Sequence, residues 1–262
     1  MLPEKHLLSK QKAQHFLANN SILNEEAKIL QPEDMDVLEI GAGDGRLSQN
    51  ILKYNPKSLA LVEIDSYWAN YLRKKFSKNK KVKIINSDFL KLPNSHSAQI
   101  IAGNIPYNIT SKILVKLSKM KFLHAVLCMQ KEVVQRICAP SSTSKYGRLS
   151  AFCQLHFLLN PLFPISKEFF HPPPKVDSQL VQLIPRKSAK LPKNLDKVSS
   201  ALFSHRLASV QNALFHSRKL WGWSKQKARK EASKRVKFKE RKVFMLAPEE
   251  VVEIARTLPG GK

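Results

Sequence analysis

Short apolar runs alternate with amphipathic stretches along the first two thirds of the chain. Five of the apolar runs predict buried strands, at residues 36–40, 59–64, 82–85, 99–103 and 125–129. Residues 46–52 predict the opening of a helix, and further helices are predicted at residues 110–119 and 131–138. Two later runs, 155–164 and 179–184, predict a closing antiparallel pair. This alternation favours an α/β fold whose sheet is mostly parallel, with a reversed edge.

Three glycines follow the first predicted strand. They stand at positions 41, 43 and 45, where they let the backbone pass close to a ligand without side-chain clashes. Dinucleotide sites typically show G-x-G-x-x-G in front of a pyrophosphate. Here the spacing is G-x-G-x-G, and the carboxylate of Asp44 would lie close to a phosphate bound at this turn. The turn therefore predicts a ligand without phosphates.

Acidic residues follow the next two predicted strands. Glu63 comes about 20 residues after the glycines, where a carboxylate can bind both hydroxyls of a ribose. Asp88 and Phe89 can offer a carboxylate to an adenine amino group beside an aromatic wall. Either acid alone would more often be a solvated charge or a helix cap. Together they describe a nucleoside without phosphate, and S-adenosylmethionine is a cofactor of that kind.

The tetrapeptide Asn104-Ile105-Pro106-Tyr107 follows the fourth predicted strand. The amide oxygen of Asn104 and the carbonyl of Ile105 could each accept a bond from the exocyclic amine of a flipped-out adenine. Such bonds help most if they strengthen as positive charge develops on the nitrogen. Pro106 restricts the backbone of the residue before it, and Tyr107 offers a ring on which a base can stack. An isolated match of this length is more often a plain turn, but here the other strand ends agree with it.

The chain resembles the small-subunit ribosomal RNA adenine N6,N6-dimethyltransferases from near residue 10 to near residue 250. Seven dispersed segments carry the resemblance in the family's order: 14–17, 38–47, 62–65, 104–109, 129–134, 146–150 and 170–178. The resemblance implies a Rossmann-like, seven-stranded methyltransferase sheet. It also implies direct transfer of methyl groups from S-adenosylmethionine to two adjacent adenosines near the 3′ end of small-subunit rRNA.

The resemblance also implies roles for individual residues. The segment with His15 and Leu17 would close over the cofactor. The implied cofactor-binding residues are His15, Leu17, Gly41, Gly43, Glu63, Asp88, Phe89 and Asn104. Asn104 would be shared with the target amine, and the acceptor pocket would be formed by residues 104–107.

Composition points to a polyanionic partner. The sequence has 45 Lys and Arg against 20 Asp and Glu, for a formal charge of +25. A positive net charge of this size favours nucleic acid as the partner. Residues 186–262 hold 20 basic and 6 acidic residues. We therefore expect a methyltransferase domain at 1–185 and a small basic helical domain for rRNA docking at 186–262. Within the latter, residues 224–235 predict a basic helix with little apolar face.

The sequence gives no indication of a membrane span, a signal peptide or a metal site. No apolar run reaches the ~18 residues of a spanning helix, and the three cysteines lack paired or metal-like spacing. We expect a cytoplasmic monomer with S-adenosylmethionine as its cofactor and the immature small ribosomal subunit as its partner. Two alternatives stay open: a DNA adenine N6-methyltransferase, and a ribosome-assembly factor that keeps the scaffold without catalysis.

Overall fold

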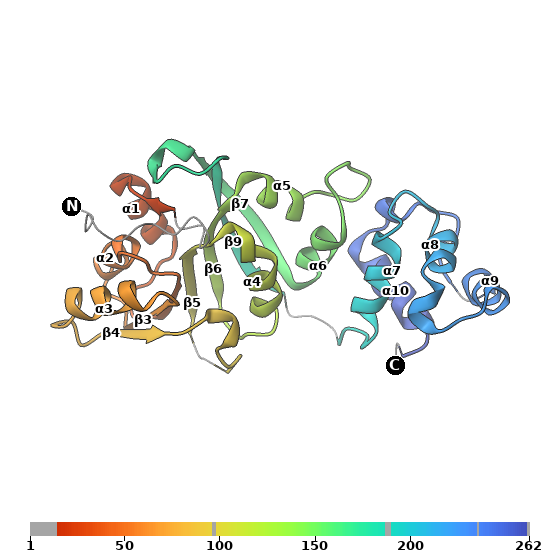
Figure 1. The fold of residues 1–262 in the computed structure, drawn as a ribbon, viewed down its shortest axis with the longest axis horizontal. Coiled ribbons are helices and arrows are strands. Elements are labelled where there is room, and N and C mark those ends of the chain that lie inside the picture. The colour runs from red at the N-terminus through yellow and green to blue at the C-terminus, as the bar shows by residue number, and fades with distance from the viewer. Residues whose placement is uncertain (1–14, 96–97, 187–189, 235, 261–262) are drawn as a thin grey trace. The chain divides into compact units, whose positions relative to one another are not determined.

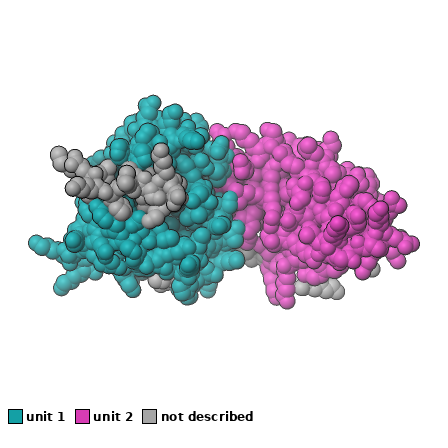
Figure 2. Space-filling model, in the orientation of Figure 1, with its two compact units in different colours: residues 1–134, 158–185 teal, residues 135–157, 186–262 magenta. Residues whose placement is uncertain are grey.

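The chain forms two compact units. The computed structural model describes residues 15–95, 98–186, 190–234 and 236–260. One unit comprises residues 1–134 and 158–185, and the other comprises residues 135–157 and 186–262 (Figure 2). Gln14 of the segment 14–17 lies outside the described residues.

The first unit is built on a seven-stranded sheet (Figure 1). Its strands, in spatial order, are β4 (Val82–Asn86), β3 (Ser58–Glu63), β2 (Asp36–Ile40), β5 (Ile100–Asn104), β6 (His124–Gln130), β9 (Ser178–Pro185) and β7 (Phe157–Ile165). The pairs from β4 to β6 are parallel, and β9 runs antiparallel to β6. The predicted mostly parallel sheet with a reversed edge is confirmed. The chain order reverses between β2 and β5, which is where α/β sheets of this kind bind ligands.

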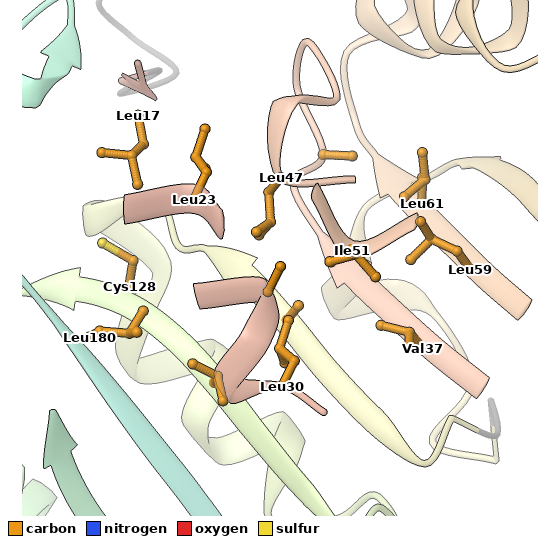
Figure 3. Packing of buried hydrophobic residues seen from close by; sticks show 14 of the residues in the cluster. Leu17, Leu23, Leu30, Val37, Leu47, Ile51, Leu59, Leu61, Cys128 and Leu180 are labelled. Carbon is orange, nitrogen blue, oxygen red and sulfur yellow. The ribbon is translucent and has the colours of Figure 1, made fainter. Parts of the chain in front are cut away.

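Helix α1 (Asn20–Ile29) precedes the strands of this sheet, and further helices follow them. These are α2 (Arg46–Leu52), α3 (Ser66–Lys75), α4 (Thr110–Leu117) and α5 (Lys131–Ile137). Side chains cap α1 and α3, since Asn19 accepts the Ile22 N–H and Asp65 accepts the Tyr67 N–H. Leucines and isoleucines of α1 and α2 pack on the inner strands to form the main core (Figure 3).

A second, two-stranded sheet ties the N-terminal arm to a distant loop. Strand β1 (Phe16–Leu17) pairs antiparallel with β8 (Phe170–His171). The Ala18 N–H extends the pairing by donating to the Phe169 carbonyl at 2.7 Å. This pairing holds the arm against the sequence that follows β7.

The second unit is helical. It contains α6 (Arg148–His156), α7 (Leu195–Phe203), α8 (Val210–His216), α9 (Lys225–Lys234) and α10 (Pro248–Thr257) around an apolar cluster of its own. Residues 135–157, which the sequence analysis assigned to the first domain, belong to this unit. The physical reason is packing: Tyr146 is fully buried against Phe203, and α6 contacts both α7 and α10.

The predicted basic helix 224–235 corresponds to α9, and it has a small apolar face. Ala228 and Ala232 are buried in the cluster of the second unit, and α9 packs on α8. Alanine side chains are short enough to permit this packing while Lys225, Lys227, Arg229 and Lys230 stay at the surface.

Candidate active site

One pocket lies at the carboxyl ends of β2, β3 and β5. It receives side chains from the N-terminal arm, the glycine turn after β2 and the segment after β5. The predicted site residues that line it are His15, Leu17, Gly41, Gly43, Glu63, Asn104, Ile105, Pro106 and Tyr107. The pocket encloses about 120 Å³, which is less than the roughly 300–1,000 Å³ of ordinary small-molecule sites.

The glycine turn is shaped for close approach. Gly41, Gly43 and Gly45 have φ of 70°, 55° and 74°, in the left-handed region that glycine adopts without strain. A Cβ on Gly43 would lie 2.5 Å from the Cε1 atom of Phe16, whose ring covers the turn. A ligand of nucleoside size would therefore require the Phe16 ring to move. Any side chain at position 43 would clash with this ring and would also obstruct the ligand.

Glu63 is held with its carboxylate facing the turn. Its Oε2 accepts the Gly43 N–H and its Oε1 accepts the Asp65 N–H, both at 2.8 Å. The side chain is buried, and this burial raises the pKa of Glu63 while the two N–H groups act in the opposite direction. The carboxylate is thus fixed in orientation, as a ribose-binding acid should be.

Asn104 ends β5 beside β2. Its Oδ1 atom is buried and has no hydrogen-bond partner among the described residues. Since buried polar atoms are nearly always paired, an orphaned acceptor in a pocket indicates a ligand that donates to it. The next residue is fixed as well, because the Ile105 N–H donates to the Cys128 carbonyl at 2.9 Å.

Tyr107 stands across the pocket with its ring held at two points. Its hydroxyl lies 2.7 Å from the Ser178 Oγ, and its ring stacks on His15 with centroids 5.7 Å apart. The His15 Nδ1 donates in turn to the Pro172 carbonyl at 2.8 Å. Burial raises the pKa of Tyr107 to about 12, so the hydroxyl stays protonated at neutral pH.

Two predicted cofactor residues do not line this pocket. Asp88 uses its Oδ1 to accept the Leu90 N–H at 2.9 Å, capping a short helical turn at Phe89–Lys91. Phe89 is buried, and the Lys116 ammonium lies 5.5 Å from its ring centroid. Asp88 therefore acts as a helix cap, which is the alternative role that the sequence left open for it.

The pocket also contains residues that the sequence analysis did not select. Phe16, Glu39, Arg46, Cys128 and Phe170 all line it. Arg46 pairs with Asp44 at 2.8 Å, and burial raises the pKa of Glu39 to about 8. Phe16, Glu39, Arg46 and Phe170 stand in segments that carry the resemblance, so those segments could have pointed to them. Cys128 is seen in the pocket only after the strands pair.

Comparisons with known proteins agree with this geometry. The sequence model of the family described as ribosomal RNA adenine dimethylase matches residues 5–245. The chain belongs to this family. A ribosomal RNA small subunit methyltransferase A from Pelagibacter ubique is 38% identical over 204 residues, covering 74% of the chain and 77% of the relative. A probable enzyme of the same name from Methanopyrus kandleri is 32% identical, covering 94% of the chain and 90% of the relative.

The fold agrees as well. The crystal structure of a dimethyladenosine transferase from Plasmodium falciparum superimposes with a TM-score of 0.78 at 26% identity, covering 92% of the chain and 96% of that protein. The chain is an S-adenosylmethionine-dependent rRNA adenine dimethyltransferase with the expected seven-stranded fold. Among the described residues, no helix is long and apolar enough to cross a bilayer.

Proposed function

We propose that this enzyme dimethylates the N6 amines of two adjacent adenosines near the 3′ end of small-subunit rRNA, within the immature subunit. The Oδ1 of Asn104 carries the proposal, because no described residue pairs with it and Asn104 lines the same pocket as the glycine turn and Glu63. The names of the bacterial and archaeal relatives support the choice of the small subunit.

The residues present fit the cofactor. Gly41 leaves room beside the backbone, Gly43 would do so once the Phe16 ring has moved, and the oriented carboxylate of Glu63 suits the two hydroxyls of a ribose. We infer that Asp88 and Phe89 serve the adenine ring from the neighbouring strand end, and that His15 and Leu17 close the pocket from the arm. S-adenosylmethionine supplies an activated methyl group when it is bound.

The acceptor side follows from Asn104 and its neighbours. The Asn104 Oδ1 accepts one N–H of the adenine amine, and the Ile105 carbonyl accepts the other. Both bonds strengthen as positive charge develops on the nitrogen, which is the condition for catalysis. A monomethylated amine keeps one N–H, so Asn104 can still bind it for the second transfer.

Tyr107 holds the base without taking part in proton transfer. Its ring provides a stacking surface, a contact worth about 1–3 kcal/mol per base. Because its pKa is about 12, its phenol is not available as a base at neutral pH. No base is needed before attack, since the amine becomes acidic only after it has been alkylated.

We further propose that the enzyme acts as a cytoplasmic monomer in ribosome biogenesis and that the basic second unit docks on rRNA. Residues 186–262 carry 20 basic and 6 acidic residues, and a field of this sign attracts the phosphate backbone. Phosphate contacts of this kind would position the enzyme, while the pocket selects the base.

Transfer of tritiated methyl groups tests the proposal. Immature small subunits, naked small-subunit rRNA and duplex DNA would be offered in parallel, with an Asn104→Ala enzyme as the control. We expect labelling of the ribosomal particle alone. Labelling of duplex DNA would favour a DNA adenine methyltransferase, and cofactor binding without any transfer would favour a non-catalytic assembly factor.

A further inference from the structure

A basic groove lies on the first unit between α2, α3 and the turn that leads into β4. It has a volume of about 780 Å³, and four lysines line it: Lys53, Lys75, Lys78 and Lys80. Amides from Gln49 and Asn79 lie among them, and no carboxylate is found among its described lining residues. The groove shares no lining residue with the pocket of Asn104.

The sequence around this groove is unusually basic. Residues 73–83 include seven lysines and arginines and no acidic residue. A run of this kind on one segment is commonly a solvated face. Here, however, the fold brings Lys53 from the end of α2 into the same concave surface.

The lysines differ in how they are engaged. Lys75 is half-buried, and its Nζ donates to the Asp44 carbonyl at 2.6 Å, so it supports the glycine turn. Lys53 is exposed and donates to the neutral side chain of Asn50 at 2.8 Å. Lys78 and Lys80 are exposed, and neither forms an ion pair with another described residue. The positive charge of the groove is therefore not neutralised by the carboxylates that the structure describes.

We propose that this groove binds the phosphate backbone of the rRNA substrate, as a second contact on the catalytic unit. The inference rests on the proposed rRNA substrate, and it adds a docking surface apart from both the base pocket and the basic second unit. Lysines act on phosphates as point charges, and side-chain amides can donate to phosphate or ribose oxygens. An anionic membrane is a poorer partner, because the apolar lining residues Leu52 and Phe76 are half-buried and offer nothing to insert.

A triple variant, Lys53→Gln with Lys78→Gln and Lys80→Gln, tests the groove. All three side chains are exposed and none lines the catalytic pocket. The matched control removes three exposed lysines of the same unit that lie outside the groove, by Lys28→Gln, Lys119→Gln and Lys121→Gln. Filter binding of a full small-subunit rRNA transcript would be measured between about 50 and 200 mM salt, the range over which phosphate contacts weaken strongly.

The Kd of the groove variant for the transcript should be roughly tenfold higher near 0.1 M salt. The slope of log affinity against log salt should become shallower by about 2 to 3, since each of three lost phosphate contacts contributes about 0.7–0.9. The control should change the slope by less than half as much. At saturating immature subunits, kcat and the KM for S-adenosylmethionine should match those of the unmodified enzyme, because none of the three replaced lysines lines the pocket.

Equal slopes for the two triple variants would overturn the proposal. Groove-dependent binding to phosphatidylserine vesicles without an effect on the transcript would also overturn it, in favour of a membrane surface. The proposed function fails separately, if the unmodified enzyme transfers no methyl group to the immature small subunit. If the unmodified enzyme transfers methyl groups but the groove variant binds the transcript like the control variant, only the groove proposal is wrong.

Discussion

Replacing Asn104 with alanine should separate catalysis from stability. Asn104 lines the pocket, and its buried Oδ1 atom has no hydrogen-bond partner among the described residues. This atom therefore contributes no hydrogen bond to the fold of the described chain. In the proposed mechanism it stabilises the positive charge that develops on the amine. Its loss should damage the reaction and spare the structure.

The magnitude follows from the type of contact. Removing one preorganised group that stabilises transition-state charge in a buried site typically costs ~10²–10³ in kcat, or about 2.7–4 kcal/mol. Leaving a polar atom buried and unpaired costs the folded state about 1–3 kcal/mol. Removing that atom relieves this cost and offsets the small loss of packing, so the melting temperature should stay equal or rise.

The assay is single-turnover methyl transfer at saturating cofactor and immature small subunits, with thermal unfolding of the same enzyme variants. Asn108→Ala is the matched control, since Asn108 is exposed four residues further on and does not line the pocket. A fall in the transfer rate of less than about tenfold would refute the role of Asn104. A melting temperature that falls together with the rate would refute the separation from stability.

Three further predictions address the ring, the buried acid and the strand contact. Tyr107→Ala should lower kcat/KM for rRNA by about ten- to a hundredfold through the lost stack, while Tyr107→Phe should retain most activity in the same assay. Burial raises the pKa of Glu26 to about 8 from 4.5, so the native state loses stability as pH rises between these values. Glu26→Gln should therefore raise the melting temperature more near pH 9 than near pH 5, and an equal gain from the exposed Glu25→Gln would count against this explanation. A Cβ on Gly103 would lie 2.6 Å from a backbone carbonyl of β2, so Gly103→Ala should lose about 2 kcal/mol or more in urea unfolding. Gly147→Ala is its control, because a Cβ there meets no atom within 4 Å, and equal losses would contradict the steric reason.

The sheet was predictable because its signals are local. The bounds of β2 match the predicted range 36–40, and α2 begins at Arg46, where the sequence predicts that a helix opens. A compact apolar run and a glycine turn mark these positions. In contrast, β1 and β8 have two residues each and exist through a pairing between residues about 150 positions apart. A strand that depends on its partner leaves no periodicity to detect. The same limit explains residues 135–157, whose assignment depends on the packing of Tyr146 against Phe203.

Much of the site was predictable because parallel strands present their carboxyl ends on one edge. That rule brings Gly41, Glu63 and Asn104 into one pocket, although each stands on a different strand. It says nothing about side chains that arrive from elsewhere. The stack of His15 on Tyr107 and the position of Phe16 over Gly43 depend on the arm pairing with β8. These contacts could be seen only in three dimensions.

The proposed function requires this pocket to deliver two methyl groups to the N6 of each target adenine. The decisive measurement is mass spectrometry of nucleosides from the rRNA of treated immature small subunits, with mapping of the modified positions. We expect N6,N6-dimethyladenosine at two adjacent positions near the 3′ end, and none after treatment with the Asn104→Ala enzyme. Methylation of another base, or of the adenine ring in place of its exocyclic amine, would contradict it.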